Sequence, residues 1–104
     1  MPQKSWKISH KSFDIEFVNS YTLSGECTET LYVNDDPVVT NHKSMRENSR
    51  REMTSAYLSA DVMHENTPHL VAVKAGTKWH RLSTCCHIFV DGELVGGDIN
   101  SKIY

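Results

Sequence analysis

Cys85 and His87 are the two residues of this 104-residue chain whose types and spacing could do chemistry. Residues two positions apart in a β-strand point to the same face of the sheet, so a strand here presents a thiol beside an imidazole. Zinc binds both groups, and His80, slightly earlier in the chain, could supply a third ligand. Structural zinc sites usually show two clear ligand pairs, whereas this chain has one. We therefore expect no cofactor, and the alternative is a zinc site made of Cys85, His87 and His80.

The same residues could be arranged for nucleophilic catalysis, with Cys85 as the nucleophile and a histidine as the base, oriented by Asp91. That chemistry needs the thiol and the imidazole in contact, and two side chains on one face of a strand need not touch. Nothing in the surrounding sequence supports those roles. We predict no catalytic residues and interpret Cys85 and His87 as half-buried residues of a strand.

Four other residues are candidates for binding a partner. Arg46, Arg50 and Arg51 form a small basic cluster, although two glutamates interleave with it as on a solvated face. Trp79 could join other aromatic side chains, among them Tyr32, Tyr57 and Phe89, on one face of a sheet. An exposed aromatic face is typical of an interface. The predicted partner-binding residues are Arg46, Arg50, Arg51 and Trp79.

The composition excludes several classes of protein. The net charge is −2, with 11 basic and 13 acidic side chains, so no basic surplus would attract nucleic acid. The longest uncharged apolar runs are only a few residues, far below the roughly 20 that span a bilayer, and the first residues have no apolar signal core. Three cysteines, an odd number, argue against a secreted disulfide scaffold. We expect a cytoplasmic protein with no nucleic-acid or membrane partner.

The elements that must position these residues are mostly strands. Ile15 and Phe17 alternate with acidic residues, which is the period of a half-buried strand, so both should face the core. Near the C-terminus, Cys86, Ile88 and Val90 share the face opposite Cys85 and His87, and we predict that this is the core face.

An internal echo indicates how the strands are arranged. Ile15-Glu16-Phe17 recurs 56 positions later as Val71-Ala72-Val73, and the stretch from Leu31 to Asp35 recurs 57 positions later from Ile88 to Gly92. Two similar strand-and-hairpin units would produce this pattern. We predict a single domain over 1–104 that is mainly β, an antiparallel β-sandwich or flattened barrel of seven or eight strands from two similar halves.

The central region fits two templates. Ser44 opens a capping-box pattern, and several later residues fall at helical spacing. From Ala56 to Val62, however, small or apolar residues also alternate cleanly with other residues, as in a strand. We expect a charged loop or short helix over 42–52 and a strand over 54–63. The alternative is an α+β fold with one helix around 44–63.

Four segments within residues 6–40 carry a resemblance to a known family. In order, they are Trp6-Lys7-Ile8, Asp14-Ile15-Glu16-Phe17, Ser24-Gly25 and Leu31-Tyr32-Val33-Asn34-Asp35. Their order and spacing resemble the Fas apoptotic inhibitory molecule family, although residues 41–52 are longer and more charged than that family's pattern. The resemblance implies an eight-stranded sandwich of two repeated units that binds protein partners and has no catalytic residues to carry over.

The sequence therefore predicts a noncatalytic protein-interaction module of unknown specificity. The alternative function is a small-ligand or metal-binding protein, or an enzyme, that uses the Cys85/His87 face. A sandwich also has edge strands, and pairing two edges across a two-fold axis is a common way to protect them. A homodimer is the secondary expectation.

Overall fold

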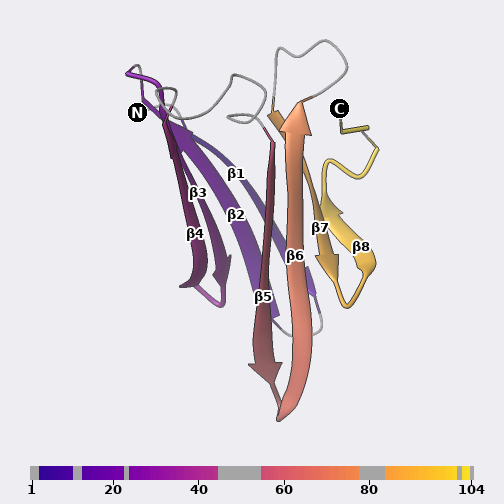
Figure 1. Ribbon diagram of the computed structural model, residues 1–104. Helices are drawn as coiled ribbons and strands as arrows, with labels where there is room; N and C mark the ends of the chain where they lie inside the picture. The colour runs from indigo at the N-terminus through magenta and orange to yellow at the C-terminus, as the bar shows by residue number, and fades with distance from the viewer. Residues whose placement is uncertain are drawn as a thin grey trace.

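The computed structural model describes residues 3–10, 13–22, 24–44, 55–77, 84–100 and 102–103. These residues form eight strands (Figure 1). In chain order they are β1 (Gln3–His10), β2 (Phe13–Tyr21), β3 (Glu26–Val33), β4 (Asp36–Ser44), β5 (Ala56–His64), β6 (Thr67–Thr77), β7 (Thr84–Val90) and β8 (Glu93–Gly97). Within these ranges no helix is long and apolar enough to cross a membrane.

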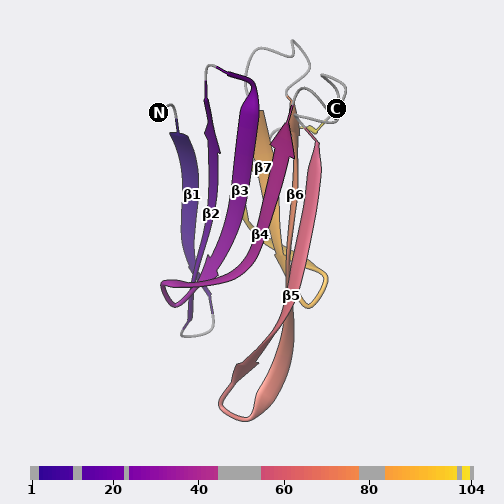
Figure 2. The same ribbon diagram turned by 60° about the vertical axis from the view of Figure 1, so that its left-hand side comes forward.

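The strands build two four-stranded antiparallel sheets, β1-β2-β3-β4 and β5-β6-β7-β8. Each strand pairs with the next along the chain, so each half of the sequence makes one whole sheet. The sheets form the two layers seen in Figures 1 and 2. The predicted β-sandwich of two similar halves is confirmed.

The similarity of the halves extends to one turn and one bulge. Asn34 and Asp91 each begin a two-residue turn with φ of 51°. In the first half the Asn34 side-chain oxygen accepts a hydrogen bond from the Asp14 backbone N–H at 2.9 Å, and in the second half Asp91 does the same for Leu70 at 2.9 Å. The strand register also shifts at corresponding places, between Leu31 and Tyr32 and between Ile88 and Phe89. The repeated sequence pattern therefore corresponds to a hairpin geometry that the two halves share.

We predict that Asn34→Ala destabilises the protein by about 2 kcal/mol and Asn34→Gly by about 1 kcal/mol. Alanine loses the hydrogen bond to Asp14 and also disfavours the positive φ, whereas glycine loses only the hydrogen bond. Urea unfolding of the three proteins measures both differences. Equal stability of the alanine variant and the unsubstituted protein would contradict this account of the turn.

The core lies between the sheets and follows the strand alternation. Ile15 and Phe17 are fully buried, as predicted, and so are Cys86 and Ile88 on the predicted core face of β7. The buried cluster draws on both sheets and consists of Ile15, Phe17, Leu31, Val33, Leu58, Val71, Val73, Ala75, Cys86, Ile88 and Val90. Because both halves contribute, neither sheet buries its apolar face alone.

The helix considered for 44–63 is wrong over 56–63, where the chain forms β5. Leu58 faces the core at 2% exposure, while its neighbour Tyr57 is 65% exposed, which is the two-residue period of a strand. Pairing with β6 along its whole length supplies the backbone partners of β5. The expected strand over 54–63 is confirmed with slightly later bounds. The charged loop or short helix expected over 42–52 is wrong at 42–44, because β4 continues to Ser44. The rest of that range falls within 45–54, which lie outside the described residues, so there it stays a prediction.

Candidate functional site

Cys85 and His87 lie on the outer face of β7, opposite Gly76 and Lys74 of β6. The chain that follows β8 runs past them. His87 Nε2 donates to the Asp98 carbonyl oxygen at 3.1 Å, and Cys85 Sγ lies 4.0 Å from the Lys102 carbonyl oxygen. As a result Cys85 is fully buried although it faces away from the core, whereas His87 is half-buried as expected.

The structure bears only in part on the predicted zinc ligands. Cys85 and His87 share a face, as the sequence indicated, and His80 lies outside the described residues. Within the described ranges, no three His, Cys, Asp or Glu side chains are grouped as metal ligands. The zinc site stays a prediction. The partner-binding residues Arg46, Arg50, Arg51 and Trp79 also lie outside the described residues, so that assignment stays a prediction too.

All three thiols are buried and free of disulfides. Burial, reinforced by the nearby charges of Asp98 and Cys85, raises the pKa of Cys86 to about 12. Burial and the charge of Glu29 raise the pKa of Cys27. A thiol attacks as its thiolate, so Cys27 and Cys86 are poorly suited to nucleophilic chemistry at neutral pH.

The sequence analysis considered Asp91 as the residue that would orient a catalytic histidine near Cys85. In the structure Asp91 contacts His69 instead. Its carboxylate lies 2.7 Å from His69 Nδ1 on β6, and its other oxygen accepts the Leu70 backbone N–H. The aspartate therefore ties the β7–β8 turn to β6. This placement gives Asp91 a structural role at the turn.

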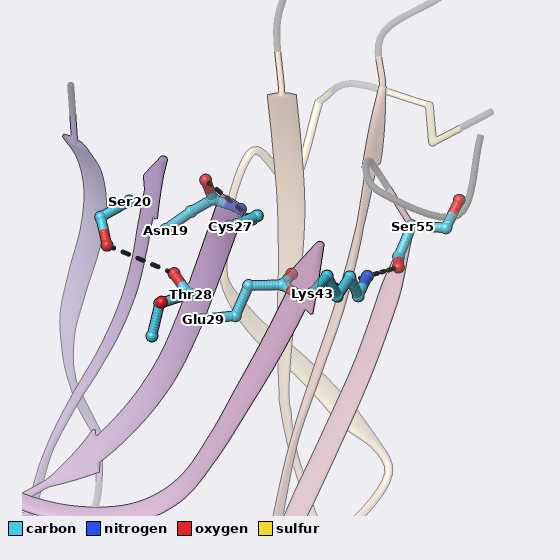
Figure 3. A network of polar contacts seen from close by, with 7 residues as sticks. All are labelled: Asn19, Ser20, Cys27, Thr28, Glu29, Lys43 and Ser55. Carbon is cyan, nitrogen blue, oxygen red and sulfur yellow. Dashed lines mark hydrogen bonds and ion pairs between the residues drawn. The ribbon is translucent and has the colours of Figure 1, made fainter. Parts of the chain in front are cut away.

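A polar network that the sequence analysis missed lies on the inner face of the first sheet, toward the end of β4 (Figure 3). Glu29 of β3 is 1% exposed, and Lys43 Nζ of β4 lies 3.2 Å from its Oε1 as an ion pair. The same Nζ donates to the carbonyl oxygen of Ser55, just before β5. Nearby, Cys27 Sγ donates to Asn19 Oδ1 at 3.9 Å. Lys43 thereby links the edges of the two sheets.

Burial has the largest effect on the protonation of Glu29. Burial raises the pKa of Glu29, and the opposing attraction of Lys43 is smaller. The ion pair and the side-chain hydrogen bond that Lys43 makes with the Glu29 carboxyl group both favour the charged form, but the effect of burial on the pKa is larger. The sequence did indicate that Glu29 faces the core, because Glu29 lies at alternate positions with Leu31 and Val33 and so shares their face of β3.

Several large apolar side chains lie on the outer face of the second sheet, the sheet of β5, β6, β7 and β8. Tyr57 and Met63 of β5 are 65% and 66% exposed, and Leu70 of β6 and Leu94 of β8 are 43% and 41% exposed. Phe89 of β7 lies half-buried among them. We call Tyr57, Met63, Leu70, Phe89 and Leu94 the apolar outer face. The sequence had placed Tyr57 and Phe89 in one aromatic group, and the structure puts both on this face, with Tyr32 on the other sheet.

The strand register makes four of these side chains neighbours. Leu94 is directly opposite Phe89. Phe89 pairs with Ala72, two residues from Leu70, so Phe89 and Leu70 are diagonal neighbours. Leu70 and Met63 are diagonal neighbours across β5 and β6. Diagonal pairs lie about 7–8 Å apart, within reach of long side chains. The apolar outer face therefore crosses all four strands.

Comparison of the chain with protein-family models, with curated proteins and with solved structures gave no match. The resemblance to the Fas apoptotic inhibitory molecule family accordingly stays a prediction from the sequence.

Proposed function

We propose that the protein is a noncatalytic protein-binding module and that the apolar outer face is its binding surface. The observation that carries this proposal is the position of Tyr57, Met63, Leu70 and Leu94, four exposed large hydrophobic side chains on one face of one sheet. An exposed apolar patch bordered by polar residues is characteristic of a site where another protein binds. Asp61 and Lys74 provide such polar neighbours on the same face.

The composition of the patch also supports binding. Tyrosine, phenylalanine and methionine are enriched at interface centres, where large rigid or adaptable side chains fill pockets of the partner. The opposite side of the sheet is packed in the core, so the patch is presented on a rigid support. Little conformational entropy is then lost when a partner binds.

Two of the three buried thiols, Cys27 and Cys86, support a noncatalytic role. The raised pKa values of Cys27 and Cys86 keep both thiols protonated at neutral pH. The buried carboxyl group of Glu29, whose pKa is raised, forms an ion pair with Lys43 that connects β3 and β4.

A photo-crosslinking amino acid placed at Leu94 tests the proposal. In extracts of the cells that naturally produce the protein, we expect one discrete adduct with a second protein. Adding Leu70→Lys to the same chain should reduce its yield about tenfold or more, because a buried lysine in the contact would be left without a partner. The adduct is then reproduced with the two purified proteins.

The matched control carries the photo-crosslinker at Thr40, which is exposed on β4 of the first sheet. It should give no such adduct. Equal adducts from Thr40 and Leu94, or an adduct unaffected by Leu70→Lys, would exclude the apolar outer face as the binding surface.

A further inference from the structure

The described residues contain four edge strands, β1, β4, β5 and β8, and three of them carry features that discourage pairing with another chain. β1 carries Lys4 and Lys7. β4 begins with Asp36-Pro37 and has an irregular register with β3. β8 has only five residues and a register shift against β7. Charges, proline, bulges and short length are the usual ways in which sheet edges are protected.

β5 has no proline and no bulge, and it is not short. Its nine residues, AYLSADVMH, include no proline, glycine, lysine or arginine and a single acidic residue, Asp61. Its register with β6 runs from Ala56 to His64 without a shift. The hairpin of β5 and β6 also extends beyond the other strands at one end of the sandwich, as Figures 1 and 2 both show. A long, regular edge of this kind is a template for another strand.

We propose that β5 pairs with β5 of a second copy of this chain, antiparallel and about a two-fold axis. The β5-β6-β7-β8 sheets of the two copies then form one continuous eight-stranded sheet. A two-fold axis perpendicular to the sheet keeps the core face and the outer face of both copies aligned. The backbone groups on the side of β5 that faces away from β6 then pair with those of the second copy. This pairing uses the backbone edge of β5 and covers Tyr57 and Met63 of the apolar outer face, whereas Leu70, Phe89 and Leu94 stay available to the partner of the proposed function.

Side-chain chemistry selects the register centred on Ala60. There Tyr57 of one copy lies opposite Met63 of the second copy, so the two most exposed apolar side chains of β5 cover each other on both sides of the axis. Asp61 of each copy lies opposite Ser59 of the other. A register centred on Asp61 would place the two carboxylates directly opposite each other, and like charges in that position are destabilising.

Light scattering on the purified protein, together with a dilution series, tests the pairing. We expect a mass twice that of the 11.8 kDa chain. Ser59 is exposed, so both Ser59→Asp and Ser59→Lys should leave the fold intact. Each dimer contains two contacts between Ser59 and Asp61, so Ser59→Asp should raise the dimer Kd about tenfold and Ser59→Lys should lower it by a similar factor.

The opposite directions of the two variants make the result specific, because a damaged fold cannot tighten the dimer. Combining Ser59→Asp with Asp61→Lys should restore the original Kd by bringing opposite charges together again. A monomeric mass at all concentrations overturns the proposal. A dimer that responds equally to the aspartate and lysine variants also overturns it. Neither outcome affects the cross-linking test at Leu94, because Leu94 lies on β8 at the other edge of the sheet.

Discussion

Lys43→Met will destabilise the protein by about 3 kcal/mol at neutral pH. The substitution leaves the Glu29 carboxylate, which is 1% exposed, buried without its cation. Removing one member of a buried ion pair commonly costs about 3–5 kcal/mol, and we expect the lower end because the Lys43 side chain is itself 11% exposed. Urea unfolding at pH 7 measures the loss.

The effect should depend on pH in a direction set by Glu29. Burial already raises the pKa of this carboxyl group in the folded protein above its value in the unfolded chain. The folded state then binds the proton more tightly, so the Glu29 contribution to stability is greatest below the unfolded pKa and is lost as pH rises through the folded pKa. Without Lys43 the folded pKa rises further. The difference in stability between Lys43→Met and the unsubstituted protein should therefore shrink as pH falls from 7 toward 5.

The double variant Glu29→Leu, Lys43→Met is the control for this interpretation. It removes both charges and replaces them with apolar groups, which is often neutral or stabilising for a buried pair. We expect its stability at pH 7 to lie within about 1 kcal/mol of the unsubstituted protein, with a large coupling energy between the two sites. If the double variant is less stable than Lys43→Met alone, the loss comes from packing of the lysine stem and the buried-charge account is incorrect.

Local alternation in the sequence predicted the parts of the fold that depend on single strands. Ile15 and Phe17 were placed in the core because each strand points alternate residues to opposite faces. The same rule applied to β3 also places Glu29 inside, on the face of Leu31 and Val33. A charged residue at a strand position that faces the core thus indicates a buried ion pair, although it does not identify the partner.

Contacts between strands could not be predicted in this way. The sequence around β5 fitted both a strand, which we expected over 54–63, and a helix. Pairing with β6 stabilises the strand, and the local sequence does not contain that pairing. Asp98 is a second case. Its main partner, Trp6, is 92 positions away in the chain, and nothing in either local sequence indicates the contact. The apolar outer face is a third case, because strand register alone brings residues of four strands together.

Asp98 closes the edge of the sandwich where β1 meets β8. One carboxylate oxygen, Oδ2, accepts the indole N–H of Trp6 at 2.8 Å and the backbone N–H of Cys86 at 3.1 Å. Trp6 belongs to β1 of the first sheet and Cys86 to β7 of the second, so a single oxygen joins the two layers. Beside it, Ile8 packs so closely over Gly96 that a Cβ there would lie 2.4 Å from the isoleucine Cγ2. The tight fit allows little rearrangement to replace a lost contact.

We therefore predict that Asp98→Ala destabilises the protein by about 3 kcal/mol, because two partly buried donors lose a charged acceptor at once. Asp98→Asn keeps an oxygen that can occupy the position of Oδ2, so its cost should be about 1 kcal/mol. Trp6→Phe removes only the indole donor and keeps an aromatic ring against Phe17, whose centroid lies 5.6 Å from that of the Trp6 ring. Its effect should therefore fall between those of Asp98→Ala and Asp98→Asn. Urea unfolding followed by circular dichroism gives all three values. An asparagine variant as unstable as the alanine variant would mean that the negative charge, rather than the shared acceptor position, holds this edge closed.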